Sequence, residues 1–514
     1  MTTPTPTQGR PSPSPLRRKP IEAIIAQSAE EARVAGEGAA QLKKSLTGKD
    51  LMGFGIGMVI GTGIFTLTGI EAKNHAGPAI TISFVIAGVV ALLAALCYAE
   101  LSSSVPAAGS AYTYAYATLG EVFAWIIGWD LILEFALGAA VVCRGWSGYM
   151  QHLIMDPSKP NQHILPDAFF GETSVVNLGA ILIALILGYI ALVGVKESAR
   201  VTNLLVIIKV AICIFVIVVG AFFIKTQNYV PFVPPAEPVH SELSGLEQPL
   251  TQFLFNLPQT AFGFSGMLAA AAVVFFAYSG FEIVANMGEE TKNPKRDLPL
   301  GIIGTLVICT ALYVGVCIVI TGMVHYTQID ESAPIAAAFT DVGLPWAGAL
   351  ISLAGVCGLM SVILVDIVGM GRVGFAMGRD KLIPAAVAKI HPKWGTPYRV
   401  TIATVVAICL LGGFVPLKAL ADMVSIGTLF AFVIVSVAVP ILRRRQPDLK
   451  RPFSVPASPV IPIVSALGCV YLMSNLSVAT WLRFLIWMAI GICVYFFYSR
   501  KHAALAELEE TSAK

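Results

Sequence analysis

Residues 51–70 read LMGFGIGMVIGTGIFTLTGI, and this stretch decides the fold that the sequence predicts. About 20 apolar residues are enough to cross a bilayer as one helix. The middle of the stretch is Gly61-Thr62-Gly63, and glycine inside a helix costs about 1 kcal/mol relative to alanine. The pattern therefore predicts a membrane helix interrupted near its centre, where the backbone comes close to a small charged solute.

The composition predicts a polytopic membrane protein. The chain has 514 residues, of which 56% are hydrophobic and 13% charged, and its mean hydropathy is +0.77. A soluble domain of this length would not tolerate such values. The nine cysteines form no CxxC or metal-type spacing, so neither a disulfide framework nor a zinc site is expected. We expect no cofactor and a proton as the driving ion. The net charge of +3 comes without a basic patch, so no nucleic-acid partner is expected.

Hydropathy predicts twelve membrane spans. They lie at residues 51–70, 79–101, 121–148, 178–195, 199–222, 266–288, 299–324, 345–371, 399–416, 420–442, 459–478 and 482–500. If residue 1 is cytoplasmic, most of the 34 Lys and Arg residues fall on inner loops. The positive-inside rule then places both tails, residues 1–50 and 501–514, in the cytoplasm of a cell whose inner or plasma membrane holds the protein.

Two groups of five spans form a predicted internal repeat. A shift of about 218 residues carries spans two to five onto spans seven to ten, as expected for repeated units. Because each unit has an odd number of spans, the second unit, residues 266–442, enters the membrane from the side opposite to the first, residues 51–222. The predicted fold is thus an all-α membrane protein with a five-plus-five inverted repeat, followed by two helices at residues 459–500.

The same shift carries residues 61–63 onto residues 279–281, inside the stretch FFAYSGFE at 275–282. A Tyr, a Ser, a Gly and a carboxylate here interrupt what should be the most apolar part of the bilayer. Unwound backbone at this depth is tolerated where it lines a cavity. The ends of half-helices offer N–H groups to an anion and carbonyls to a cation. Two such breaks fit an amino acid, which carries a carboxylate and an ammonium two bonds apart.

Packing is the alternative reading of the first helix. Gly53, Gly57 and Gly61 recur at four-residue spacing and can form a small-residue packing face. That reading leaves Thr62-Gly63 and the polar break in span six without an explanation. We therefore expect Gly53, Gly57 and Gly61 to pack against a neighbouring helix, and the break at residues 60–63 to bind the solute.

Ionisable side chains inside spans are candidates for coupling. Lys209 lies about ten residues into span five, where an unpaired ammonium costs at least about 2.5 kcal/mol. Desolvation disfavours the charged form, so a buried lysine can load and release a proton; a structural lysine held by carbonyls is the alternative. Glu134 lies mid-span in helix three, one turn from Asp130. We expect it to order the pocket, relay a proton or meet a cationic substrate side chain; a structural hydrogen-bonding role is the alternative. Asp366 in span eight and Glu100 at the inner end of span two are assigned to a cytoplasmic vestibule.

Several stretches resemble one family. They are RRKPIEAI (17–24), GIGMVIGTGIFTLTG (55–69), YAELSSSVPAAGSAYTYAYATLGEVFAWIIGWDLILEF (98–135), FFAYSGFE (275–282), EETKNPKRDLP (289–299) and FAMGRDKLIP (375–384). They are distributed between residues 17 and 384 of the chain. The chain resembles the amino acid-polyamine-organocation superfamily and, within it, a bacterial member of the cationic amino acid transporter family.

The resemblance implies the five-plus-five fold of the leucine transporter and proton-coupled uptake of amino acids. By motif, the implied substrate-binding residues are Ile60, Gly61, Thr62 and Gly63 from span one, with Phe276, Ala277, Tyr278 and Ser279 from span six. Glu282 is added to the predicted substrate-binding residues because it directly follows the second break. Lys209 and Glu134 are the expected proton-coupling residues. The family often has aspartate where Glu282 stands, so the resemblance leaves the substrate open between cationic and neutral amino acids.

The sequence thus predicts a proton-coupled amino acid permease that works by alternating access. An exchanger of one amino acid for another, or for a polyamine, is the first alternative on the same fold. A membrane enzyme lacks a catalytic set: GMGRVG at 369–374 ends a membrane helix and follows no strand. A nutrient sensor would need a signalling domain that tails of this length do not hold. The expected partners are an amino acid and the lipid bilayer, with the chain acting as a monomer or beside a small single-span accessory subunit.

Overall fold

The computed structural model describes residues 17–19, 46–105, 110–154, 165–171, 174–194, 199–238, 245–258, 260–384, 386–391 and 394–504. This part of the chain is predominantly helical, and its strands are one short pair, β1 (Glu237–Pro238) antiparallel to β2 (Thr260–Ala261). Of the predicted tails, residues 1–16, 20–45 and 505–514 lie outside the described ranges.

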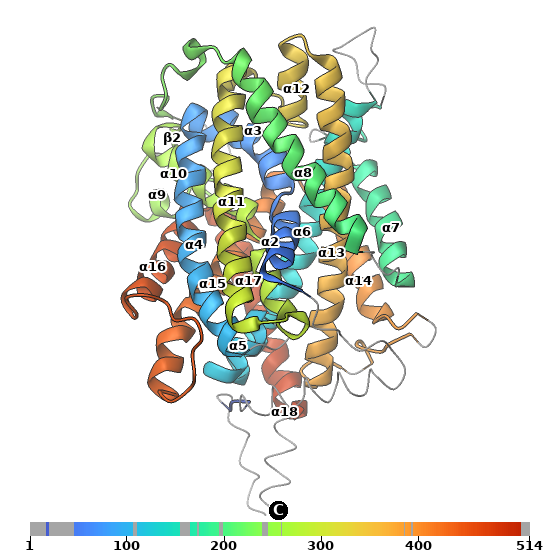
Figure 1. Cartoon of the computed structure of the whole chain (residues 1–514), viewed down its shortest axis with the longest axis vertical. Helices are drawn as coiled ribbons and strands as arrows, with labels where there is room; N and C mark the ends of the chain where they lie inside the picture. Colours follow the sequence, from blue (N-terminus) through green and yellow to red (C-terminus); the bar gives the residue numbers. More distant parts are fainter. Residues whose placement is uncertain are drawn as a thin grey trace, which may run out of the picture.

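The helices run mainly along one direction and form a single bundle (Figure 1). The first half contains α2 (Gly48–Val59), η1 (Gly63–Leu67), α3 (Thr68–Glu71), η2 (Ala72–Ala76), η3 (Gly77–Ala79), α4 (Ile80–Ser104), α5 (Ser110–Thr118), α6 (Glu121–Leu153), α7 (Leu178–Val193), α8 (Ala199–Gly220), η4 (Ala221–Phe223) and η5 (Thr226–Tyr229). The second half contains α9 (Leu250–Leu254), α10 (Gly263–Val274), η6 (Phe275–Tyr278), η7 (Phe281–Glu290), α11 (Pro294–Met323), η8 (Tyr326–Gln328), α12 (Pro334–Asp341), α13 (Pro345–Arg379), α14 (Tyr398–Phe414), α15 (Leu417–Arg445), α16 (Val460–Ser474), α17 (Val478–Val494), η9 (Tyr495–Ser499) and α18 (Arg500–His502).

Eight helical stretches of the described chain are long and apolar enough to cross a membrane, and three shorter apolar helices accompany them. One stretch, residues 63–104, covers the outer part of the first predicted span and all of the second, because the turn at Gly77 keeps helical structure on both sides. The chain is therefore a multi-pass membrane protein. The count of twelve spans and the inverted repeat stay predictions.

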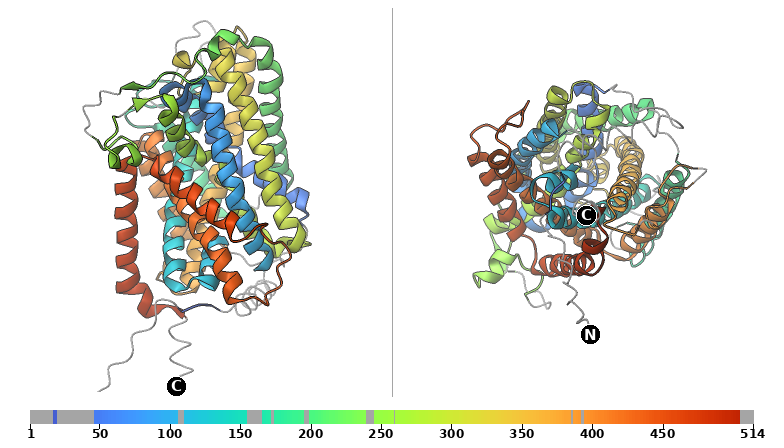
Figure 2. Two further views of the ribbon diagram at one scale, coloured as in Figure 1. Left: turned by 90° about the vertical axis from the view of Figure 1, so that its left-hand side faces the viewer. Right: turned by 90° about the horizontal axis from the view of Figure 1, so that it is seen from below.

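Apolar side chains on the outside of the bundle are consistent with a surrounding lipid phase. Leu185 on α7, Leu467 on α16 and Ile486 on α17 are 53%, 63% and 61% exposed. A soluble monomer rarely exposes apolar surface over so many helices. Figure 2 shows α16 and α17 at the outside of the bundle.

Local sequence signals set several helix ends. Thr47 and Asp50 form a capping box at the start of α2, where the Thr47 N–H donates to Asp50 Oδ2 over 2.8 Å. Asn177 caps α7 by accepting from the Ala180 N–H over 2.8 Å. Proline stands in the first turn of α11, α12 and α13, where its missing N–H costs no helical hydrogen bond.

The predicted glycine packing face is wrong at Gly53, and Gly61 makes only an ordinary contact. A Cβ on Gly53 would meet nothing within 4 Å, and one on Gly61 would meet Val362 at an ordinary 3.7 Å. Close packing occurs at Gly57, whose Cβ would lie 2.5 Å from Val206 on α8, and at Gly55, against Thr305 on α11. The four-residue spacing failed because two different helices, α8 and α11, pack on two different sides of α2.

One end of the bundle is tied together by residues 17–19. The Arg17 guanidinium donates to both oxygens of Glu121, over 2.6 and 2.9 Å, and to the Arg500 carbonyl over 3.2 Å. Both Arg17 and Glu121 are buried. Lys19 pairs with Asp380 at the end of α13 over 3.0 Å. The first and last described segments therefore lie at the same end of the molecule (Figure 1).

Candidate functional site

The first predicted break is present in the structure. α2 ends at Val59, Ile60 has extended backbone angles (φ −75°, ψ 94°), and helical structure resumes with η1 at Gly63. A helix that stops leaves its last carbonyls without partners from the next turn. The carbonyl of Gly57 accepts a hydrogen bond from Lys209 Nζ over 2.6 Å instead.

The second break lies in the equivalent helix. α10 ends at Val274 and continues as the tighter η6 to Tyr278, after which Ser279 is extended and Gly280 has φ +111°. An L-residue with a side chain rarely adopts that φ, which explains a glycine here. Both carboxylate oxygens of Glu282 accept from the Gly280 N–H at 3.0 Å, so Glu282 caps the start of its own half-helix, η7.

The two breaks touch each other. A Cβ on Gly63 would lie 2.4 Å from both Cα and Cβ of Ala277, and a Cβ on Gly280 would lie 3.3 Å from Met58. Gly63 is therefore the position at which the backbone of the first broken helix approaches that of the second. The sequence prediction had assigned Gly63 to solute binding, whereas this geometry also gives it a packing role.

Tyr313 on α11 joins the two breaks, and sequence reasoning missed it. Its hydroxyl lies 2.6 Å from the Val59 carbonyl and 3.0 Å from the Ala277 carbonyl, as a donor shared between them. The side chain is fully buried. A Tyr in an apolar span was a visible signal, but the identity of its partners depends on packing that the sequence does not reveal.

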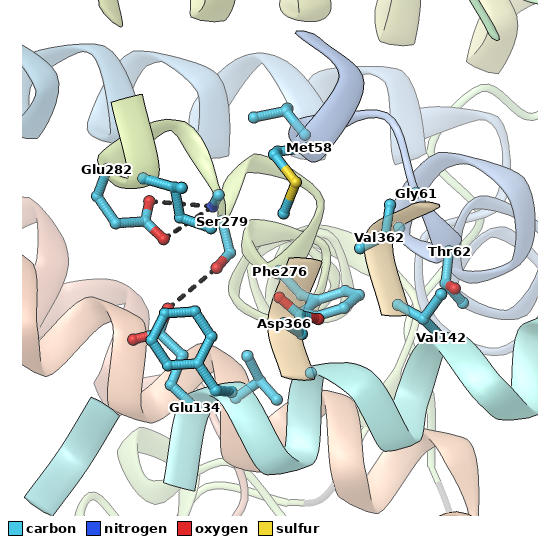
Figure 3. A pocket seen from close by; sticks show the side chains of 17 residues that line it. Met58, Gly61, Thr62, Glu134, Val142, Phe276, Ser279, Glu282, Val362 and Asp366 are labelled. Carbon is cyan, nitrogen blue, oxygen red and sulfur yellow. Dashed lines mark hydrogen bonds between the residues drawn. The ribbon is translucent and has the colours of Figure 1, made fainter. Parts of the chain in front are cut away.

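A small pocket lies between the breaks, with a volume of about 40 Å³ (Figure 3). Its lining comes from both broken helices and from α6, α13 and α15. The lining residues are Met58, Val59, Gly61, Thr62, Gly63, Glu134, Phe135, Gly138, Val142, Phe276, Ser279, Gly280, Glu282, Ile283, Val362, Asp366 and Val424. Six of the nine predicted substrate-binding residues are among them.

The other three predicted residues, Ile60, Ala277 and Tyr278, do not border the pocket. Ala277 lies against Gly63, as described above. Tyr278 is fully buried and its hydroxyl donates to the Phe84 carbonyl on α4 over 2.8 Å. Tyr278 therefore anchors the second break to α4 from behind.

Three carboxyl groups border the pocket. Glu134 on α6 accepts from the Ser279 hydroxyl over 3.1 Å and from the Thr428 hydroxyl over 2.7 Å, so it connects the second break to α15. Glu282 caps Gly280, and Asp366 comes from α13. Figure 3 shows Glu134 and Glu282 on either side of Ser279.

The predicted place of Asp366 in a cytoplasmic vestibule is wrong, because its carboxyl group lines the central pocket. The sequence shows only how far Asp366 lies along its span. Because α13 is 35 residues long, the depth of Asp366 in the membrane could not be predicted to within one or two helical turns. Glu100 does lie at the end of α4, where it pairs with Arg443 and accepts from the Val455 N–H over 2.7 Å. It is thus a structural tie between α4 and the end of α15.

Lys209 on α8 is fully buried and lies behind the first break instead of in the pocket lining. Besides its bond to the Gly57 carbonyl, its aliphatic stem passes Gly358 on α13, where a Cβ would come 3.0 Å from Lys209 Cε. A side chain at position 358 would therefore displace the lysine. The Lys209 ammonium thus supports the first break through the Gly57 carbonyl.

Comparison of the whole chain with known proteins identifies its family. A family model described as amino acid permease matches residues 46–501. The chain is 44% identical over 499 residues to the branched-chain amino acid permease BcaP of Bacillus subtilis (strain 168), with 96% of this chain and 99% of the relative covered. It is 42% identical over 495 residues to the methylthioribose transporter of the same organism, with 95% and 99% covered. It is 37% identical over 433 residues to the vacuolar cationic amino acid transporter 4 of Arabidopsis thaliana, with 84% and 68% covered.

Proposed function

Because the chain belongs to the amino acid permease family, we propose that it is a secondary active transporter that carries amino acids with protons by alternating access. The observation that supports this most directly is the meeting of two interrupted helices at one pocket. The breaks fall at residues 60–62 and 279–280, and the pocket draws lining residues from both. Sites of this kind lie between discontinuous helices in secondary transporters.

The two breaks supply complementary groups for an amino acid. The N–H groups of Thr62 and Gly63 start the second half of the first helix, where the positive end of the helix dipole favours a carboxylate. The end of α2 and the Ser279 hydroxyl offer oxygen atoms to an ammonium group. The carbonyls of Gly57 and Val59 already accept from Lys209 and Tyr313, which leaves the other groups at the first break for the solute.

Proton coupling is proposed to involve Lys209 and Glu134. Lys209 holds the Gly57 carbonyl, so loss of its proton would weaken the support of the first break. Glu134 accepts from hydroxyls on the second broken helix and on α15, and a protonated carboxyl group would become a donor as well. Gain or loss of a proton at Lys209 would therefore affect the first broken helix, and at Glu134 the second.

We propose that the protein is a monomer in the cell membrane and that both of its termini lie in the cytoplasm. Residues 17–19 and α18 meet at one end of the bundle, which is what an even number of spans requires. The basic residues of the inner loops then lie on the cytoplasmic side.

Counterflow in proteoliposomes tests the proposal. The purified full-length protein is reconstituted, loaded with an unlabelled amino acid and supplied with a labelled one, with and without an imposed pH gradient. Methylthioribose is included because of the relative named above. We expect counterflow with at least one amino acid and accumulation driven by an inward proton gradient. Uptake indifferent to the gradient would favour an exchanger, and a preference for methylthioribose over every amino acid would contradict amino acid transport.

A further inference from the structure

A second cavity, of about 380 Å³, lies between α6, α13, α14 and the end of α17. Trp125 and Trp129 of α6, Ala403 of α14 and Tyr498 of η9 are among the residues that line it. Trp125 is fully buried and Ala403 is exposed, so the cavity runs from the interior to the surface of the bundle. An apolar cavity of about 150 Å³ admits a molecule the size of benzene, so this one has room for a longer hydrocarbon.

The polar groups of the cavity wall are already bonded within the protein. The indole N–H groups of Trp125 and Trp129 donate to carbonyls of α17 over 2.8 and 2.9 Å, and the Thr404 hydroxyl donates to a carbonyl of its own helix over 2.9 Å. Apart from the half-buried Tyr498, the rest of the lining is apolar. A buried water needs two to four polar partners. The cavity therefore favours hydrocarbon over water.

The surface around the opening is apolar. Ile402 and Val406, which flank Ala403 on α14, are exposed, and so is Phe497, the neighbour of Tyr498. On a multi-pass membrane protein, exposed apolar side chains of this kind contact the acyl chains of the bilayer. The hydrocarbon nearest to the opening is thus that of the lipids.

One end of the cavity lies where the first and last described segments meet. Residues 382–384 and 387 line the cavity at this end. The Ser499 hydroxyl donates to the Leu382 carbonyl over 2.7 Å, which joins the lining segment to the start of α18. Figure 1 shows α18 and the lower end of α13 at this end of the bundle. In the proposed topology it is the cytoplasmic end.

Exposed basic side chains lie at this end of the cavity. Residues 372–400 hold six lysines and arginines and a single carboxylate, Asp380, which already forms an ion pair. Lys389 and Arg399 are exposed, and the Arg399 guanidinium donates to the Ala386 carbonyl over 2.9 Å, beside the lining segment. Neither Lys389 nor Arg399 pairs with a carboxylate in the part of the chain that the structure describes. Both cations remain available to an anion of the membrane surface.

We propose that this cavity binds an anionic phospholipid of the cytoplasmic leaflet, with one acyl chain between α6, α14 and α17 and the phosphate group at Arg399 and Lys389. Basic side chains at the cytoplasmic interface attract anionic headgroups. Each CH₂ group that leaves water strengthens binding about fourfold. The acyl chain therefore holds the lipid in the cavity, and the two cations select its headgroup.

The bound chain would lie directly behind the central pocket. Ile132 and Ala136 of α6 line the cavity, whereas Glu134 between them borders the central pocket. Met370 of α13 lines the cavity one turn after Asp366. The lipid thus fills space behind two helices that shape the central pocket. The inference does not depend on the proposed function, since lipid binding is measured without any transported solute.

Fluorescence quenching by brominated lipids tests the proposal on the full-length protein. Bromine on an acyl chain quenches tryptophans that the chain touches, and Trp125 and Trp129 line the cavity. The protein is reconstituted in phosphatidylcholine bilayers, into which brominated phosphatidylglycerol or brominated phosphatidylcholine is titrated. Because two cations each favour an anionic lipid about fivefold, we expect half-maximal quenching at an at least tenfold lower mole fraction of phosphatidylglycerol. Coincident curves would overturn the proposal without any variant having to fold.

Charge variants test the contacts with the headgroup. Arg399→Gln and Lys389→Gln should each lower the preference for phosphatidylglycerol about fivefold, and Arg399→Lys, which keeps the charge, should retain it. Arg296→Gln is the matched control, because Arg296 is exposed in the first turn of α11 and does not line the cavity. A preference that is unchanged in both glutamine variants, or lowered equally in the control, would contradict the assignment of the phosphate group.

A filled cavity tests the position of the acyl chain. Ala403→Phe places a ring at the opening and should make the quenching curve of phosphatidylglycerol coincide with that of phosphatidylcholine. Val406→Phe, at an exposed site of the same helix outside the cavity, should leave both curves unchanged. Glycerol phosphate, which has the headgroup charge and no chain, should not displace the brominated lipid at equal concentration. Full quenching in Ala403→Phe, or displacement by glycerol phosphate, would refute an acyl-chain site.

Discussion

Replacing Gly63 by alanine should separate the two broken helices. The added Cβ would lie 2.4 Å from Cα and Cβ of Ala277, more than about 1 Å closer than the 3.5–4.0 Å at which carbon atoms pack. One of these atoms belongs to the backbone, so no side chain can rotate away. The first and second breaks must therefore move apart by about 1 Å at their point of contact.

The functional effect should exceed the effect on stability. Overpacking of this kind costs about 1–3 kcal/mol, which a membrane protein of this size can survive. A misplacement of about 1 Å between groups that bind one substrate can lower activity by about 100-fold. We therefore expect Gly63→Ala to fold, with a modestly lowered thermal unfolding temperature in detergent, and to lose counterflow by about two orders of magnitude.

Gly53→Ala is the matched control, since it makes the same substitution in the same interrupted helix. A Cβ there meets nothing within 4 Å, and alanine favours the helix by about 1 kcal/mol relative to glycine. Counterflow should stay at the wild-type level. Wild-type transport in Gly63→Ala, or an equal loss in Gly53→Ala, would refute the claim that contact between the breaks positions the site.

Three further substitutions probe the surrounding supports. Lys209→Met should abolish accumulation driven by a pH gradient while counterflow remains measurable; accumulation at the wild-type level would exclude Lys209 from coupling. Tyr313→Phe leaves two buried carbonyls without their shared donor and should lower the free energy of unfolding by about 1–3 kcal/mol, as measured by thermal denaturation in detergent. Arg17→Ala leaves the buried carboxylate of Glu121 without its cation and should cost about 3–5 kcal/mol; Lys49→Ala, at an exposed site, should be neutral.

The positions of the two breaks could be predicted from sequence because their signals are local. Glycines and polar residues interrupt an apolar run at 61–63 and again at 279–282, and an internal shift relates the two places. The breaks in the structure, at 60–62 and 279–280, lie within two residues of the prediction. Interruptions of this kind are readable because unwound backbone at membrane depth is tolerated only where it is buried in protein or lines a cavity.

Features that depend on contacts between distant helices could not be predicted. Tyr313 looked like any aromatic residue in a span, although it bonds to both breaks. Gly53 was expected to pack and Gly63 to bind a solute, although Gly53 faces open space and Gly63 packs against the backbone at Ala277. Asp366 was misplaced because hydropathy gives the register of a long helix only to within a few residues, while one turn decides whether a carboxyl group lies in a pocket.

The charge of the pocket connects substrate binding with proton coupling. A pocket bordered by Glu134, Glu282 and Asp366 cannot be closed off from water cheaply while all three are ionised and uncompensated. The ammonium of a bound amino acid compensates one negative charge, and a proton taken up by a carboxyl group removes another, so closure favours the state that holds both.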